Sequence, residues 1–243
     1  MPVPISFLEF AGIAKAAYHP EVTTAGGGFT RHSPMDRRVS GFQGAIYRRP
    51  AGDWVVGIAG TQPGQDSNAD IVADAGFGGS RTGIIGGILG GPILGPLISL
   101  GSAMGAATLE AQCAAASDLV GQARGAMPRG DRLYLTGHSL GGGICQIIAA
   151  RLGVPAVCFN PPSVTAVSGV KAAYDRTRPA IVCLQVRNDP INHTKHVGAW
   201  LGKVVPLPTA RTGGGAHSID QTYVELSPSG PFTAIGARDP FSF

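Results

Sequence analysis

One short stretch constrains the fold of this chain more than any other. An apolar run that begins at Leu133 has the length of a buried strand, residues 137–141 form a G-x-S-x-G pattern, and residues 142–152 have the composition of a helix. A serine nucleophile in a G-x-S-x-G pattern needs this order of strand, sharp turn and helix. The glycines are needed because a side chain two residues before or after the serine would collide with the neighbouring strand or helix. The pattern therefore predicts that Ser139 is a nucleophile at the start of a helix. A glycine-rich structural turn is the alternative interpretation.

Strands and helices are predicted to alternate on both sides of this turn. Apolar residues recur at helical spacing or in short runs bounded by glycine and proline. This alternation predicts a three-layered α/β fold with a mostly parallel central sheet, and 243 residues are enough for a single domain, residues 1–243, of that kind. Residues 23–40 are rich in glycine and arginine and are predicted to be a loop. The expected helices span residues 5–18 and 106–127, the expected strands span 42–48, 54–59, 156–160 and 180–186, and 68–74 is expected to be a turn or short helix.

The charge distribution argues against a nucleic-acid partner. The formal net charge is +4, only 14% of the residues are charged, and the arginines are scattered rather than gathered in a stripe with aromatic residues. The four cysteines lie within predicted helices and strands, and their spacing matches neither a zinc site nor a disulfide scaffold. They are expected to be buried, reduced thiols, and no metal or organic cofactor is predicted. The cysteines are Cys113, Cys145, Cys158 and Cys183.

An uncharged, glycine-rich stretch lies upstream of the predicted nucleophile. No charged residue occurs between Thr82 and Leu109, a length that would admit a membrane span. Pro92 and Pro96 would break a continuous helix near its middle, however. We interpret residues 76–105 as an insertion that forms a mobile apolar lid or an acyl-binding surface; a glycine-rich packing segment and a transmembrane helix are the alternatives. The apolar residues expected to meet a substrate are Ile84, Ile85, Ile88, Leu89, Ile93, Leu94 and Leu97.

A serine hydroxyl needs a base, and the base needs an acid that orients it. Asp189 directly follows a predicted buried strand, the kind of position where open α/β sheets gather functional groups, although an Asn-Asp-Pro turn would also explain it. His217 follows a glycine run and precedes a predicted helix, so a flexible loop can carry its imidazole over the sheet edge. His193 and His196 fit a solvated loop, and His138 is expected to pack or to support the turn. We therefore predict Asp189 as the acid and His217 as the base, with an ordinary loop histidine as the alternative for His217.

Acyl transfer also needs hydrogen-bond donors for the developing oxyanion. The N–H of Leu140, at the start of the helix that follows the nucleophile, is one expected donor. The other is expected at an earlier strand end, where Thr61 follows Gly60 and offers both an N–H and a hydroxyl.

These segments resemble the class 3, or fungal-type, triacylglycerol lipases, a family that also has bacterial members. Residues 136–142 resemble the nucleophile elbow of the family and are the most specific match. The other matches follow in the family's order: its first helix at 10–18, its oxyanion strand at 57–61, its acid strand at 186–190 and its histidine region at 216–223. The resemblance implies a bacterial relative of the fungal enzymes, with an α/β-hydrolase fold.

The resemblance also implies roles for individual residues. A lid is implied between the oxyanion strand and the elbow. The sequence departs from the family where Ala59 replaces the usual arginine, where the predicted lid is longer and richer in glycine, and where the interval between acid and histidine is shorter. The implied catalytic triad is Ser139, Asp189 and His217, and the implied oxyanion hole is Thr61 and Leu140.

The function implied is hydrolysis of lipid esters, either acylglycerols or phospholipids, at a membrane or lipid interface. One alternative is an antibacterial phospholipase effector with a secretion-system or immunity partner. Another is a membrane-inserting, lipid-binding protein in which the hydrolase site is inert. Residues 1–4 lack the basic segment, apolar core and cleavage site of a signal peptide, so synthesis in the cytoplasm is expected, with any export through a specialised secretion system.

Overall fold

An eight-stranded sheet runs through the described part of the chain, which in this computed structural model comprises residues 3–60, 103–196 and 198–242. The predicted insertion at residues 76–105 lies outside the described residues as far as residue 102, and so do Thr61, the expected turn at 68–74 and the apolar residues from Ile84 to Leu97. The strands are β1 (Thr30–Arg31), β2 (Asp36–Arg37), β3 (Gln43–Arg49), β4 (Asp53–Ile58), β5 (Arg132–His138), β6 (Ala156–Phe159), β7 (Ile181–Val186) and β8 (Lys203–Leu207).

The strand order brings the predicted nucleophile to the middle of the sheet. The order is β1-β3-β4-β5-β6-β7-β8, and β2 also pairs with β3. β3 and β4 form the predicted antiparallel hairpin, whose turn contains Gly52 at φ +81°. From β4 to β8 every neighbouring pair is parallel, and Ile58 at the end of β4 pairs with Gly137 near the end of β5. The carboxyl ends of the parallel strands therefore lie together along one end of the sheet. In open α/β sheets, ligand sites form at this end.

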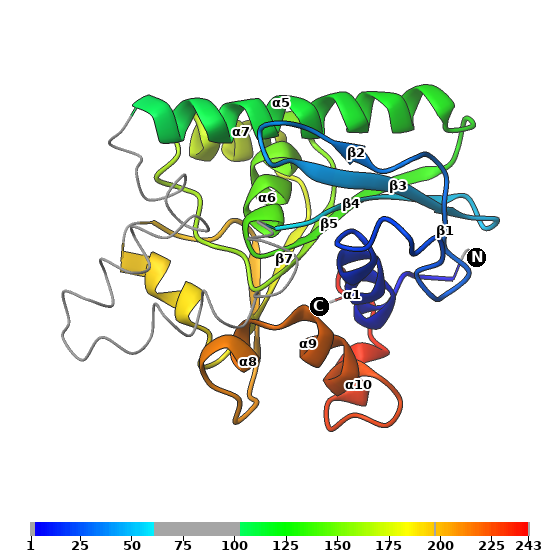
Figure 1. The fold of residues 1–243 in the computed structure, drawn as a ribbon, viewed down its shortest axis with the longest axis vertical. Helices are drawn as coiled ribbons and strands as arrows, with labels where there is room; N and C mark the ends of the chain where they lie inside the picture. The colour runs from blue at the N-terminus through cyan, green and yellow to red at the C-terminus, as the bar shows by residue number, and fades with distance from the viewer. Residues whose placement is uncertain (1–2, 61–102, 197, 243) are drawn as a thin grey trace.

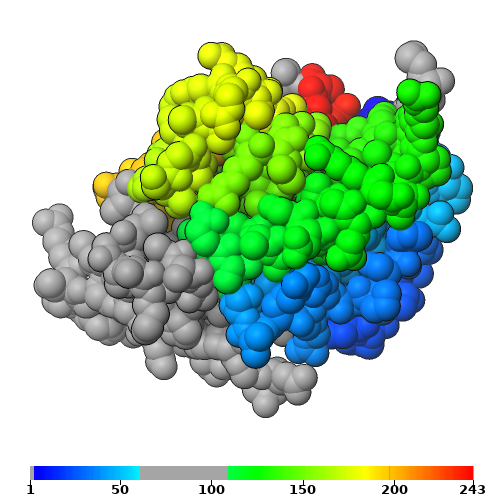
Figure 2. All heavy atoms as spheres, turned by 90° about the horizontal axis from the view of Figure 1, so that it is seen from above, coloured from blue at the N-terminus to red at the C-terminus, as the bar shows by residue number. Residues whose placement is uncertain are grey.

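Helices cover both faces of the sheet (Figure 1). Helices α5, α6 and α7 pack on one face, and α1, α9 and α10 pack on the other. Figure 2 shows α5, in green, on the outside of the molecule, beside the N-terminal strands in blue. The helices are α1 (Phe7–Ala16), α5 (Ala103–Ala126), α6 (Leu140–Leu152), α7 (Val170–Thr177), the 3-10 helix η1 (Pro190–His196), α8 (Gly213–His217), α9 (Ile219–Leu226) and α10 (Thr233–Gly236).

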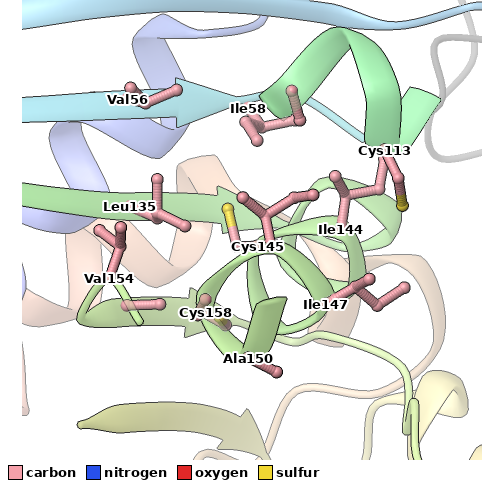
Figure 3. Close-up of a cluster of buried hydrophobic side chains, with 14 of the residues drawn as sticks. Val56, Ile58, Cys113, Leu135, Ile144, Cys145, Ile147, Ala150, Val154 and Cys158 are labelled. Carbon is pink, nitrogen blue, oxygen red and sulfur yellow. The ribbon is translucent and has the colours of Figure 1, made fainter. Parts of the chain in front are cut away.

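Two apolar cores form because successive residues of a strand point to opposite faces. In β4, Val56 and Ile58 face the core under α5 and α6, whereas Val55 faces the core under α1. In β7, Cys183 and Leu184 divide in the same way. Strands β4, β6 and β7 are thus buried on both sides along their whole length, which explains why they appear in the sequence as continuous apolar runs. Figure 3 shows the first core, where α6 packs on β4, β5 and β6.

The cysteines are part of this packing. All four are buried and unpaired, which confirms the prediction of buried, reduced thiols. Cys113, Cys145 and Cys158 lie in the core drawn in Figure 3. Burial raises the pKa of the Cys113 thiol to about 12 and those of Cys145 and Cys158 well above the usual value. Because the thiolate is the reactive form, these groups are chemically quiet.

Several expected elements differ from the observed ones. The segment 23–40, predicted to be a loop, contains β1 and β2, two-residue strands that pair with the edge of β3. Strand β8 and helix α7 were not predicted from the sequence. The helix expected at 5–18 spans Phe7–Ala16 because Ser6 and Glu9 form a capping box at its start. The helix expected at 106–127 is α5, which begins at Ala103.

Candidate active site

Ser139 occupies the turn between β5 and α6 with a strained backbone. Its φ of +56° and ψ of −128° are rare for a residue with a side chain. A Cβ on Gly137 would lie 2.7 Å from the main chain of Gly141. A Cβ on Gly141 would lie 2.6 Å from the carbonyl oxygen of Ala59 and closer still to that of Ile58. The two glycines are therefore required by sterics, and the strain they permit marks the turn as a functional candidate.

The structure brings three predicted site residues into one hydrogen-bonded chain. The Oγ of Ser139 lies 2.8 Å from Nε2 of His217, and Nδ1 of His217 lies 2.8 Å from Oδ2 of Asp189. A carboxylate can only accept, so Nδ1–H donates to Asp189, and Nε2 is left to accept the Ser139 hydroxyl proton. Ser139 is 4% exposed, His217 9% and Asp189 3%, so these hydrogen bonds are largely shielded from water.

Asp189 is fixed at the point where β7 ends and η1 begins. Its N–H donates to the carbonyl of Val186 at 3.1 Å, and its Oδ1 accepts the N–H of Ile191 at 2.8 Å. The Asn-Asp-Pro turn does form, and it leaves Oδ2 directed at His217. The side chain of Asp189 is 0% exposed, so the hydrogen bonds to both oxygens compensate for its removal from water.

His217 is the last residue of α8, a finding that corrects the sequence interpretation. The glycine run before it was expected to be a flexible loop, but residues 213–217 form a helical turn. The side chain of Arg211 donates to the carbonyl of Gly215 and makes an ion pair with Glu225 of α9 at 2.8 Å. The expected helix after His217 is present as α9. The base candidate is thus carried on ordered backbone.

His138 and Tyr18 form a second buried chain that ends on His217. The hydroxyl of Tyr18 lies 2.8 Å from Nδ1 of His138, and Nε2 of His138 lies 2.6 Å from the carbonyl oxygen of His217. Burial, followed by the neighbouring His217, lowers the pKa of His138 well below its usual value, and burial raises the pKa of Tyr18. Both groups are therefore neutral near pH 7, so Tyr18 donates to His138 and His138 donates to the carbonyl.

Asn160 lies beside the candidate site and was not predicted from the sequence. It directly follows β6, is fully buried and adopts φ +43°, a left-handed conformation that asparagine tolerates better than most residues. Its Nδ2 donates to the carbonyl of Ala216 at 3.1 Å, and its Oδ1 accepts the N–H of Val186 at 3.0 Å. The available signal was a polar residue between a predicted buried strand and Pro161-Pro162, because a buried asparagine is expected to hydrogen-bond to other groups.

Only one of the two residues predicted for the oxyanion hole lies within the described residues. The N–H of Leu140 lies in the first turn of α6, where no carbonyl of the helix can accept it. Thr61 lies outside the described residues. Gly60, which precedes it, packs against the turn: a Cβ there would lie 3.0 Å from the Cβ of Ser139. The N–H of Gly60 is already donated to the hydroxyl of Tyr18 at 2.8 Å, so it is not the second donor.

The other candidate histidines stay apart from this cluster. His193 and His196 are exposed on η1, with ring centroids 6.1 Å apart, and neither makes a hydrogen bond to Ser139, Asp189 or His217 in the described structure. Within the ranges described, no group of three or more His, Cys, Asp or Glu side chains is arranged to hold a metal ion. Nor does this part of the chain contain a helix with the length and apolarity of a membrane span.

A solved structure shares this arrangement of sheet and helices. Lipase II from Rhizopus niveus aligns over 77% of this chain and 72% of its own, with a TM-score of 0.50 and 15% sequence identity. The chain shares its fold with a fungal lipase. This likeness confirms the predicted α/β-hydrolase fold with a mostly parallel sheet. The triacylglyceride lipase of Rhizomucor miehei aligns over 97% of this chain and 95% of its own, with a TM-score of 0.48 and 11% identity. In sequence, no protein-family model and no curated protein matches the chain.

Proposed function

We propose that this protein is a serine hydrolase that cleaves the acyl esters of lipids. The observation that carries the proposal is the buried chain from Ser139 through His217 to Asp189, set on a strained turn at the start of a helix. A hydroxyl, an imidazole and a carboxylate in this order activate the hydroxyl as a nucleophile. The same three groups in an ordinary core would not need the unfavourable backbone conformation of Ser139.

In the proposed reaction, Ser139 Oγ attacks the carbonyl carbon of the ester while its proton passes to Nε2 of His217. Asp189 stabilises the imidazolium that forms, through the hydrogen bond from Nδ1. The tetrahedral intermediate then breaks its bond to the alcohol oxygen, and His217 donates its proton to the departing alcohol. Water next attacks the acyl-enzyme and gives a proton to His217. The second tetrahedral intermediate then breaks its bond to Ser139 Oγ, which takes the proton back from His217 as the carboxylic acid leaves.

The oxyanion of each tetrahedral intermediate needs donors that are in place before the reaction. We assign one donor to the N–H of Leu140, which belongs to the first turn of α6 and lies beside the nucleophile. We assign the other to Thr61, through its N–H and hydroxyl, because Gly60 next to it packs against Ser139. The helix N-terminus also favours negative charge at this point.

A lipid ester is the substrate class that the remaining features favour. The fold is shared with a protein named as a lipase. The uncharged stretch between Thr82 and Leu109 precedes the turn in the chain and supplies apolar side chains suited to acyl groups. The choice between acylglycerols and phospholipids depends on the groups that recognise the head group of the lipid.

The test compares wild type with Ser139→Ala on a short-chain p-nitrophenyl ester, a long-chain one and phosphatidylcholine vesicles. We expect hydrolysis that favours the long-chain ester or the phospholipid and that the mutation abolishes. Activity confined to the short-chain ester would replace the lipid assignment with a general esterase. Vesicle leakage without hydrolysis, equal in both proteins, would overturn the proposal in favour of a membrane-inserting protein.

A further inference from the structure

His217 sits on a helix that cannot hold itself in place. Helix α8 has only five residues, three of which are glycine. Short helices are marginal in water, and glycine adds backbone freedom that must be lost on folding. The reaction nevertheless requires the imidazole to stay within hydrogen-bonding distance of two other side chains, and an error of about 1 Å can cost about 10²-fold in rate. Something outside α8 must therefore fix its end.

Two buried side chains supply this constraint at consecutive carbonyl groups. Asn160 Nδ2 donates to the carbonyl of Ala216 at 3.1 Å, and His138 Nε2 donates to the carbonyl of His217 at 2.6 Å. These are the last carbonyls of α8, which have no partner within the helix. Asn160 and His138 follow or end the neighbouring strands β6 and β5, so they hold α8 directly to the rigid sheet.

Asn160 also connects the base to the acid. Its Oδ1 accepts the N–H of Val186, the last residue of β7, and Asp189 follows three residues later. The Asn160 amide therefore binds the segment that carries His217 through its Nδ2, and the strand that precedes Asp189 through its Oδ1.

His138 extends the constraint toward the proposed oxyanion hole. Its Nδ1 accepts from Tyr18, and the hydroxyl of Tyr18 accepts the N–H of Gly60, the residue before Thr61. The series of hydrogen bonds thus runs from Gly60, two residues after β4, through Tyr18, which follows α1, and His138, at the end of β5, to the carbonyl of His217. Both members stay neutral near pH 7, so its direction does not reverse there.

We propose that Asn160 and His138 are positioning residues, which hold His217 in line with Ser139 and Asp189 by binding the main chain of α8. This inference rests on the proposed function, because it concerns the same three groups. Neither residue touches a reacting atom in this scheme. Both act through the backbone on either side of the His217 side chain.

The first test uses two matched amide-to-carboxyl substitutions. Gln146 is buried like Asn160 and makes the same kind of bridge, to the carbonyl of Pro162 at 2.9 Å and from the N–H of Leu201 at 3.0 Å, but its side chain makes these hydrogen bonds away from Ser139, His217 and Asp189. Asn160→Asp loses the amide donor to Ala216, and we expect kcat to fall about 10- to 100-fold with KM within about twofold. Gln146→Glu is expected to lower Tm while keeping kcat. Equal effects on kcat would overturn the inference.

The second test asks whether a donor at the Nε2 position of His138 is enough. The amide nitrogen of Gln can reach the place of Nε2, whereas that of Asn can reach only the place of Nδ1. We therefore expect His138→Gln to keep at least about tenfold more kcat than His138→Asn. Equal kcat in the two variants would show that His138 acts only through packing. This pair remains informative if Asn160→Asp fails to fold.

A readout without substrate separates this inference from the proposed function. In protein labelled with ¹⁵N-histidine, the Nε2–H of His138 and the Nδ1–H of His217 should give slowly exchanging NMR signals. We expect the His217 signal to broaden or vanish in Asn160→Asp and to persist in Gln146→Glu. An unchanged His217 signal in Asn160→Asp overturns the positioning role. A wild-type protein with these signals but no Ser139-dependent hydrolysis overturns the proposed function alone.

Discussion

Asp189 accepts the Nδ1–H of His217 at 2.8 Å with one carboxylate oxygen and the N–H of Ile191 at 2.8 Å with the other. The carboxylate is thus held by its own turn before it binds the imidazole. This arrangement selects the one tautomer of His217 whose Nε2 can accept the proton of Ser139. In the proposed mechanism, Asp189 therefore orients His217 rather than removing a proton from it.

Asp189→Asn should therefore lower kcat by about 10³- to 10⁴-fold without unfolding the protein. The amide keeps the shape of the side chain, but its NH₂ group favours the tautomer of His217 in which Nε2 carries the hydrogen. The comparison is of kcat on a p-nitrophenyl ester, with circular dichroism as the check on folding. A folded variant with more than a tenth of wild-type kcat would contradict the role.

The glycines of the elbow should be irreplaceable, whereas a glycine elsewhere should not. Gly141→Ala should lower the free energy of unfolding by at least about 2 kcal/mol, because its Cβ would meet the carbonyls of Ile58 and Ala59. Gly121 lies exposed on α5, and a Cβ added there would have open space within 4 Å, so Gly121→Ala should raise it by about 0.5–1 kcal/mol. Urea unfolding of both variants checks the pair, and similar losses in the two would refute the steric argument.

The buried His138 should make stability depend on pH. Its folded-state pKa is depressed by burial, so below its unfolded pKa of about 6.5 the unfolded chain binds a proton that the folded chain does not. The free energy of unfolding should then fall as the pH decreases below about 6.5, by up to about 1.4 kcal/mol per pH unit from this group. Tyr18, whose pKa is raised, stays neutral throughout.

In His138→Gln that contribution is absent, and the other ionisable groups are common to both proteins. Urea unfolding between pH 7.5 and pH 5 should therefore show that the free energy of unfolding of the variant depends less steeply on pH. The difference in slope corresponds to up to one proton taken up on unfolding. Identical slopes would mean that His138 is protonated as readily in the folded protein as in the unfolded one.

The elbow was the most predictable part of the site, because its requirements are local. A sharp turn that excludes side chains on both sides leaves a pattern of glycines at fixed spacing around Ser139. The position of Asp189 followed from a similar local cue, the end of an apolar strand. The conformation of α8 did not, because glycine carries no preference that distinguishes a loop from a helical turn held by its neighbours.

The supporting residues were less visible because their partners lie far away in the chain. Tyr18 and His138 are 120 residues apart, and Asn160 is 56 residues from Ala216. Their contacts are created by the sheet, which brings the carboxyl ends of β4, β5, β6 and β7 together. The sequence shows which residue type stands at each strand end, but it does not show which distant group that residue binds.

The missed strands have a related cause. β1 and β2 belong to the sheet through main-chain bonds to β3 and have no buried alternating side chains. β8 lies at the other edge, where only Val205 and Leu207 are buried, and it contains Pro206, which an edge strand tolerates. Hydrophobic periodicity detects central strands better than edges.

The most direct measurement of the central claim is covalent labelling of the nucleophile. Wild type is treated with a long-chain alkyl fluorophosphonate and analysed by mass spectrometry, beside Ser139→Ala and His217→Ala. The account predicts one adduct per chain on the peptide that contains Ser139, none in Ser139→Ala, and labelling of Ser139 in His217→Ala slowed by at least about 10²-fold. Labelling of another residue, or labelling of Ser139 at the same rate without His217, would contradict it.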